Sequence, residues 1–179
     1  MSRPRQSGST TLWSLVLFTT LALFAVTLYL IFVVAPVEKQ MGIVQKIFYF
    51  HVPSAYAMYL GFGASALGSA VYLIKRDAKW DALAVAGAEV GTLFCVIVLL
   101  TGPLWARKAW GVWWTWDPRL TTTLLAGMIF AAYLALRSMG DAGEVEKRFA
   151  SGLALFGLKG LEVMHRGITM IITETFRED

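Results

Sequence analysis

Four long apolar stretches separated by short polar segments dominate the pattern of this chain. They run at about 12–34, 47–74, 82–104 and 120–136, and Glu89 is the one charged residue inside them. Each approaches or exceeds the roughly 20 residues that a helix needs to cross a bilayer. The pattern therefore predicts an all-α, polytopic integral membrane helix bundle with four transmembrane helices. Because the first stretch is longer than the apolar region of a cleavable signal peptide, we expect an uncleaved first span.

The C-terminal part breaks this pattern. The stretch 149–158 is apolar but short, and Lys159 and Glu162 follow it. A fifth span through these charges would be costly in lipid. We therefore expect a four-span membrane domain at 1–148 and an atypical tail at 149–179, which forms an interfacial helix or an incomplete fifth span.

Composition narrows the class of protein further. Hydrophobic residues make up 57% of the chain and charged residues 16%, which excludes an ordinary soluble domain. The net charge is +4, but the positive residues lie at the ends of apolar stretches, so we expect a lipid bilayer and no nucleic acid as a partner. The single cysteine, Cys95, lies in an apolar stretch and is expected to be a packing residue; the chain has no Cys-x-x-Cys pair for redox chemistry.

Lysine and arginine are distributed unevenly between the two sides of the predicted bundle. Eight would share the side of the N-terminus and five the other side, which predicts a cytoplasmic N-terminus and places segment 105–121 and His51 at the outer face. The eight are Arg3, Arg5, Lys75, Arg76, Lys79, Arg137, Lys147 and Arg148, and the five are Lys39, Lys46, Arg107, Lys108 and Arg119.

Segment 105–121 is unusually rich in tryptophan. It holds five of the seven tryptophans of the chain, at positions 105, 110, 113, 114 and 116, more than anchoring at a membrane interface requires. We interpret the segment as a flat, apolar platform with a basic rim that suits a large planar ligand; a plain aromatic belt is the alternative. Helical spacing would put Trp110, Trp113, Trp114 and Asp117 on one face, but Gly111 and the proline after Asp117 oppose a continuous helix there.

The polar residues near this segment each have a structural and a functional interpretation. Asp117 precedes a proline and so resembles the N-cap of the fourth span, which does not exclude contact with a ligand. Arg107, Lys108 and Arg119 either anchor the chain at the interface or pair with acidic groups of a ligand.

Two further residues lie within the apolar stretches. His51 can ligate iron through a neutral imidazole or serve as a simple hydrogen-bonding group. Glu89 is either functional, as intramembrane carboxylates often are, or protonated and hydrogen-bonded to a neighbouring helix.

Three stretches resemble a known family. Residues 110–121, Trp-Gly-Val-Trp-Trp-Thr-Trp-Asp-Pro-Arg-Leu-Thr, resemble the tryptophan-rich WWD signature of the haem-handling proteins of cytochrome c biogenesis. Residues 46–55 (KIFYFHVPSA) resemble the start of the second span in the haem exporter protein C family of the cytochrome c maturation (Ccm) system, and 101–106 (TGPLWA) fits as well. The resemblance covers about residues 30–158.

This resemblance implies a multi-pass protein of the bacterial cell inner membrane, with six spans in the family. Such a protein binds haem b non-covalently at the periplasmic face and delivers it to a membrane-tethered haem chaperone, with help from ATP-binding-cassette transporter subunits. We therefore expect a binding and transfer protein and not an enzyme. The expected haem contacts are Trp110, Trp113, Trp114, Trp116, Asp117 and Arg119, with His51 as a ligand of the iron.

The end of the chain departs from the family pattern. After Phe156-Gly-Leu158 the expected Trp-Trp-x-x-Leu-His loop and a sixth span do not follow. We therefore expect a truncated chain without the second axial histidine, and we do not expect His165 to replace it.

Two functions of other classes remain open from the sequence. One is a haem- or quinone-anchoring membrane subunit of a respiratory complex, which would usually show intramembrane histidines on two or more helices. The other is a non-haem assembly scaffold that uses its tryptophans for protein contacts.

Overall fold

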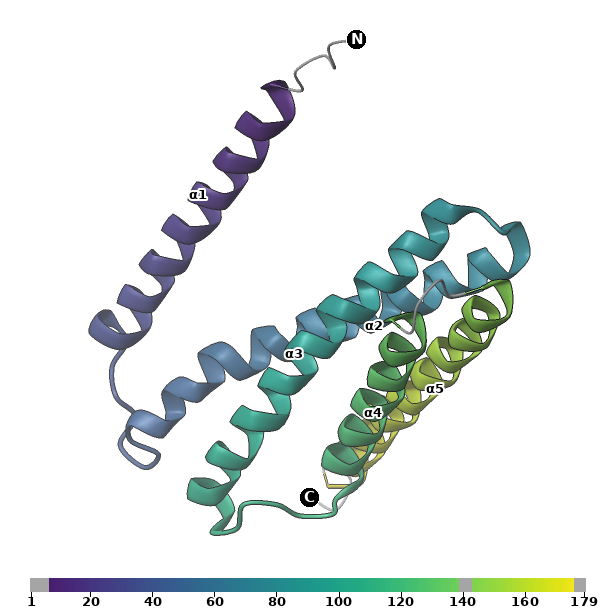
Figure 1. Cartoon of the computed structure of the whole chain (residues 1–179). Helices are drawn as coiled ribbons and strands as arrows, with labels where there is room; N and C mark the ends of the chain where they lie inside the picture. Colours follow the sequence, from purple (N-terminus) through teal and green to yellow (C-terminus); the bar gives the residue numbers. More distant parts are fainter. Residues whose placement is uncertain (1–6, 139–142, 176–179) are drawn as a thin grey trace. The chain divides into compact units, whose positions relative to one another are not determined.

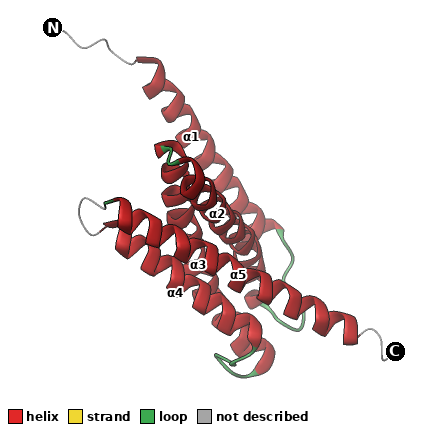
Figure 2. Cartoon of the chain, turned by 90° about the vertical axis from the view of Figure 1, so that its right-hand side faces the viewer, coloured by secondary structure: helices red, strands yellow, loops and turns green. Residues whose placement is uncertain are grey.

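The computed structural model describes residues 7–138 and 143–175, and the surroundings of side chains at 10–138, 143–160 and 162. This described part is all-α, as predicted, and contains no β-strand (Figures 1 and 2). The chain divides into two compact units, residues 1–46 and 47–179. Two residues counted in the prediction of orientation, Arg3 and Arg5, lie outside the described residues. The side chain of His165 also lies outside them.

The first unit consists of one long helix and the turn that follows it. Helix α1 (Ser7–Tyr29) continues into a π-helical turn, η1 (Leu30–Val34), and ends at Ala35, whose backbone is extended as expected for a residue before proline. The buried Lys46 ammonium group donates to the carbonyl oxygens of Ile31 at 2.7 Å and of Phe32 and Ala35 at 3.2 Å each. This lysine satisfies carbonyl groups that have no partner at a helix C-terminus and lies at the negative end of the helix dipole.

The second unit is a bundle of four helices. A short 3₁₀ turn, η2 (Ile43–Ile47), leads into it from the first unit. Helix α2 packs along α3, α4 packs along α5, and α5 also contacts α2 (Figure 1). The four are α2 (Phe48–Lys75), α3 (Ala78–Trp110), α4 (Pro118–Ser138) and α5 (Glu144–Thr175).

Glycines let the backbones of α2 and α3 approach each other closely. A Cβ atom added at Gly61 would lie 2.5 Å from the backbone nitrogen of Gly91, and one added at Gly87 would lie 2.6 Å from that of Ser65. Any larger residue at these positions would push the two helices apart. Such small-residue contacts are typical of helices that associate within a bilayer.

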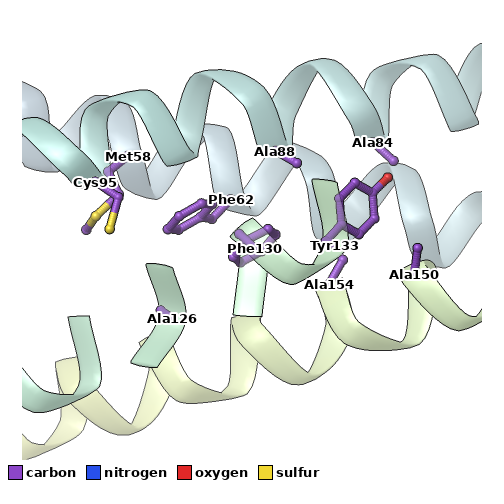
Figure 3. Packing of buried hydrophobic residues seen from close by; sticks show 10 residues of the cluster. All are labelled: Met58, Phe62, Ala84, Ala88, Cys95, Ala126, Phe130, Tyr133, Ala150 and Ala154. Atoms are coloured by element: carbon purple, nitrogen blue, oxygen red, sulfur yellow. The ribbon is translucent and has the colours of Figure 1, made fainter. Parts of the chain in front are cut away.

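The core of the second unit lies between this helix pair and α4 and α5. Figure 3 shows the rings of Phe62 and Phe130 facing each other, and their centroids are 3.9 Å apart with planes 7° from parallel. Cys95 is buried in the same cluster, next to Met58 in Figure 3, as expected for a packing residue. Small residues of α5 complete the core, so α5 contributes to the bundle. The members are Met58, Phe62, Ala84, Ala88, Cys95, Ala126, Phe130, Tyr133, Ala150 and Ala154.

Ion pairs join the helices at the end of the bundle where α2 ends. The guanidinium of Arg137 lies 2.7 Å from a carboxylate oxygen of Asp81, linking α4 to α3. Arg76 pairs with Glu144, and the Tyr72 hydroxyl donates to the same carboxylate at 2.8 Å, linking α2 to α5. These two contacts hold the pKa of Glu144 below its ordinary value, the tyrosine hydrogen bond being the larger cause.

Four helices in the described part are long and apolar enough to cross a membrane, which confirms the four predicted spans. Four such helices are typical of a multi-pass membrane protein. Their ranges are Thr10–Val34, Ile43–Lys75, Ala78–Trp110 and Pro118–Ser138.

Two boundaries differ from the sequence pattern. Helix α3 continues past Leu104 to Trp110, so the first part of the tryptophan segment is helical. Helix α5 begins at Glu144 and runs through the expected boundary between residues 148 and 149. Because Ala150 and Ala154 of α5 are buried in the core, the start of the expected tail packs in the bundle. The interfacial helix or incomplete fifth span expected for this tail remains a prediction.

Candidate functional site

A cavity of about 190 Å³ lies in the second unit where α2 begins, α3 ends and α4 begins. Its walls are mostly apolar and aromatic, and His51 and Arg119 are its two residues with strongly polar groups. The lining residues are Ile47, Phe48, His51, Val98, Leu99, Gly102, Trp105, Ala106, Trp110, Arg119, Leu120 and Thr123.

His51 lies in the first turns of α2 and is half-buried. Its ring nitrogen Nδ1 is 2.8 Å from the hydroxyl oxygen of Thr101 on α3. The ring also lies against Gly102, where an added Cβ would be 3.4 Å from the imidazole Cε1. The backbone and one hydroxyl of α3 therefore fix how the imidazole is held at the cavity wall.

Aromatic rings from two helices form one side of the cavity. Phe48 of α2 packs edge-to-face on Trp105 of α3 with centroids 5.2 Å apart, and Trp105 packs in the same way on Trp110 at 5.1 Å. The guanidinium of Arg119 lies 5.7 Å from the centroid of Trp110, within the range of a cation–π contact. The wall is thus apolar, with one cation at its edge.

The rest of the tryptophan segment is a loop beside the cavity. Helix α3 ends at Gly111, whose φ of 78° lies in the left-handed region that glycine tolerates best. Arg107 donates to the carbonyl oxygen of Gly111, and its guanidinium lies 5.9 Å from the ring centroid of Trp113. Trp113 and Trp116 are 56% and 76% exposed, so this loop presents broad indole faces to the surroundings.

Asp117 is the N-cap of α4, as its position before a proline predicted. One of its carboxylate oxygens accepts from the backbone N–H of Leu120 at 2.8 Å, and the other accepts from the Thr115 hydroxyl at 3.0 Å. Asp117 does not line the cavity. Its visible role is to set where the loop ends and α4 begins.

The structure brings together some of the predicted site residues and separates others. His51, Trp110 and Arg119 line the same cavity, although the first is far from the other two in the sequence. The other predicted contacts, Trp113, Trp114, Trp116 and Asp117, lie in the adjoining loop and outside the cavity lining.

The predicted flat platform is not what the ring pairs form. Trp105 and Trp110 are 82° from coplanar, and Trp114 and Trp116 are 78° from coplanar with centroids 5.6 Å apart. Tryptophans crowded along a short segment pack edge-to-face because the ring edge of one is attracted to the π face of the next. A planar ligand would therefore meet individual ring faces and edges instead of one continuous surface.

Sequence reasoning missed Phe48, which lines the cavity, and Thr101, which contacts His51, and it included Trp105 only as part of the tryptophan platform. A spacing signal for them was present. Phe48 and His51 are three residues apart, and Thr101 and Trp105 are four apart, so each pair shares one face of its helix. Glu89, in contrast, is exposed on α3 and lies outside the cavity.

Comparison with known protein families gives a match over nearly the whole chain. The family model described as "Heme exporter protein C" matches residues 4–172. The matched range includes every residue that lines the cavity and the whole tryptophan segment.

Three curated relatives illustrate the similarity. "Heme exporter protein C" of Bradyrhizobium diazoefficiens is 36% identical over 141 residues, covering 79% of this chain and 52% of the relative. The protein of that name from Escherichia coli K12 is 35% identical over 135 residues, covering 75% and 55%. A ccmC-like mitochondrial protein of Marchantia polymorpha, named for cytochrome c biosynthesis, is 35% identical over 128 residues, covering 71% and 55%. The chain thus spans about half the length of the curated relatives it matches.

Proposed function

Since this chain belongs to the haem exporter protein C family, we propose that it binds haem b non-covalently and delivers it for cytochrome c biogenesis. The observation that carries the proposal is the cavity in which one imidazole, two indole rings and one guanidinium come together from three helices. The names of the relatives, which refer to haem export and to cytochrome c biosynthesis, support the same function.

The residues present fit the chemistry of haem. A neutral imidazole at His51 can ligate iron. Trp105 and Trp110 offer apolar contact to a planar ring, and the guanidinium of Arg119 can form charge-assisted hydrogen bonds with the carboxylates at the edge of that ring. When bound, haem would supply the iron that His51 ligates.

The size of the cavity indicates that it would enclose only part of a haem molecule. Its volume of about 190 Å³ is below the roughly 300–1,000 Å³ of pockets that enclose small ligands. A haem held by His51 would therefore extend beyond the cavity, and the exposed Trp113 and Trp116 are the apolar surface beside it. An incompletely buried ligand remains accessible to a second protein, as delivery requires.

Each group then has a distinct task in binding and release. His51 fixes the position of the metal, and Trp105 and Trp110 exclude water from the apolar side of the ring. Arg119 orients the ring by pairing with its carboxylates. The loop at 111–117 presents the contact surface for the acceptor. These tasks are binding and transfer, and we propose no enzymatic reaction.

The charge distribution supports an orientation in the bacterial inner membrane. In the second unit, the end opposite the cavity carries Lys75, Arg76, Lys79, Arg137, Lys147 and Arg148, whereas the cavity end carries Arg107, Lys108 and Arg119. From the positive-inside rule we propose that the cavity faces the periplasm and that the N-terminus lies in the cytoplasm. We propose a membrane-tethered haem chaperone as the acceptor and ATP-binding-cassette transporter subunits as further partners.

The haem content of the purified chain tests this function. We expect the chain, expressed in a haem-replete host and extracted in mild detergent, to carry haem measurable as its pyridine complex. His51→Ala should lower the affinity for haem by at least about tenfold, which corresponds to about 1.4 kcal/mol, and should thereby lower the haem content. Tyr56→Phe, at an exposed position of α2 outside the cavity lining, is the matched control and should retain haem. A wild-type chain without haem would favour a non-haem scaffold and refute the proposal.

A further inference from the structure

The Thr101 hydroxyl contacts both a backbone carbonyl of its own helix and the imidazole of His51. The hydroxyl oxygen lies 2.7 Å from the carbonyl oxygen of Ile97 and 3.4 Å from that of Val98, both in the preceding turn of α3. It also lies 2.8 Å from Nδ1 of His51. One oxygen therefore faces a carbonyl and an imidazole nitrogen at hydrogen-bonding distance simultaneously.

The hydroxyl has one proton to donate, and the carbonyl oxygen can accept a hydrogen bond but cannot donate one. Two oxygens at 2.7 Å without a proton between them would repel each other, so the Thr101 hydroxyl donates to Ile97, as threonines in helices commonly do. The same oxygen must then accept from His51, which requires a proton on Nδ1. A neutral imidazole with its proton on Nδ1 has a free lone pair on Nε2.

We propose that Thr101 is a positioning residue that holds His51 in this tautomer and so prepares Nε2 as a ligand for iron. The proposal rests on the proposed function and adds a residue to it. A hydrogen bond from the non-ligating ring nitrogen of a metal-binding histidine fixes the ring orientation and raises the basicity of the ligating nitrogen. Thr101, on the neighbouring helix α3, accepts this hydrogen bond from Nδ1 of His51 in the proposed arrangement.

The same geometry defines which ligand class the site accepts. An unprotonated Nε2 offers an electron pair and has no proton to donate. It suits an electron-pair acceptor such as the iron of a metalloporphyrin, and it cannot donate a hydrogen bond to the carbonyl of a quinone. Thr101 therefore favours the haem function over a quinone-anchoring function for this cavity.

Nitrogen NMR of the ligand-free protein tests the tautomer directly. The chain has two histidines, so ¹⁵N-histidine labelling gives two imidazoles, and the spectrum of His51→Ala assigns them. At about pH 8.5, two units above the ordinary histidine pKa of about 6.5, we expect His51 to show a protonated Nδ1 and an unprotonated Nε2. Thr101→Ser keeps the hydroxyl and should keep this tautomer, whereas Thr101→Val should shift the population towards protonated Nε2. A protonated Nε2 in the wild-type chain would overturn the proposal.

Two porphyrin probes test the consequence for binding. Thr101→Val should weaken the binding of haemin by about 10- to 100-fold, the usual effect of removing such a partner, and Thr101→Ser should stay near wild type. Metal-free protoporphyrin IX has the same ring and carboxylates without the iron, so all three chains should bind it equally. Equal haemin affinity in wild type and Thr101→Val would overturn the assignment of Thr101. A wild-type chain that shows the expected tautomer but binds no haemin would instead support only the part of the proposal in which Thr101 holds the tautomer, and it would refute the proposed function.

Discussion

At the scale of single residues, the cavity divides the tryptophans into two groups with different surroundings. Trp105 and Trp110 line the cavity beside His51. Trp113 and Trp116 lie in the loop, where more than half of each side chain is exposed. The first group should therefore determine how tightly a ligand binds, and the second how the ligand is presented to an acceptor.

Replacing one tryptophan from each group tests this division. Trp110→Ala removes part of the cavity wall and should weaken haemin binding by on the order of 1–3 kcal/mol, the value of burying one large apolar side chain. Trp116→Ala should change the affinity by much less, because its ring lies outside the cavity lining. Haemin titration followed by absorbance measures both. Equal losses in the two variants would contradict the division.

The sequence predicted some of these residues and not others for a physical reason. Asp117 could be identified as a helix cap because the signal, an aspartate before a proline, is local. Trp110 and Arg119 belong to one motif that carries the family resemblance. Thr101 was missed because its partner, His51, lies on another helix, and no local pattern specifies which faces of α2 and α3 meet.

At the scale of secondary-structure elements, close contact between α2 and α3 fixes the positions of the cavity residues on one helix relative to those on the other. The glycines that permit it lie along both helices, and an added Cβ at Gly68 would be 2.7 Å from the backbone nitrogen of Ala84. Because the obstructing atoms belong to the backbone, a larger side chain cannot be accommodated by rotamer changes. The position of His51 relative to Thr101 depends on this contact.

Two glycines of α2 form a matched pair for testing the contact. Gly61→Ala would place a Cβ 2.5 Å from the backbone of α3, whereas no atom lies within 4 Å of a Cβ added at Gly63. We expect Gly61→Ala to lower stability by about 1–3 kcal/mol through overpacking. Gly63→Ala should be neutral or slightly stabilising, since alanine has the higher helix propensity. Thermal unfolding in detergent measures both, and similar melting temperatures for the two variants would show that the helices are not in close contact.

The elements themselves were more predictable than their packing. Apolar stretches of sufficient length predicted four of the helices, because a bilayer leaves few alternatives to a helix for such stretches. Helix α5 was predicted only as an interfacial helix or an incomplete fifth span from residue 149, because its charged residues interrupt a short apolar face. Ala150, Ala154 and Gly157 lie three or four residues apart on that face, and a Cβ added at Gly157 would lie 2.8 Å from the Phe130 ring.

At the scale of the whole molecule, the two ends of the second unit have different charge. The end away from the cavity has the denser cluster of lysine and arginine, and ion pairs between Arg137 and Asp81 and between Arg76 and Glu144 tie its helices together. This asymmetry supports a cytoplasmic location for that end. The cavity and the tryptophan loop would then face the periplasm.

Labelling of introduced cysteines in right-side-out spheroplasts tests this orientation. Val112→Cys and Ser138→Cys are both at exposed positions near opposite ends of the second unit, and neither changes the charge. An impermeant maleimide should label Val112→Cys in intact spheroplasts and Ser138→Cys only after lysis. The unsubstituted chain, with Cys95 buried, is the control. The reverse labelling pattern would show that the orientation is wrong.

The central claim is that His51 ligates the iron of haem in this cavity. Its most direct test is chemical rescue of His51→Ala, monitored by the Soret absorption of bound haemin. Removing the side chain leaves room beside Thr101 and Gly102 for free imidazole. We expect His51→Ala to lose or shift the Soret band, and we expect added imidazole to restore most of the wild-type band. Tyr56→Phe should show the wild-type spectrum with or without imidazole. A wild-type Soret band in His51→Ala before imidazole is added would contradict the claim.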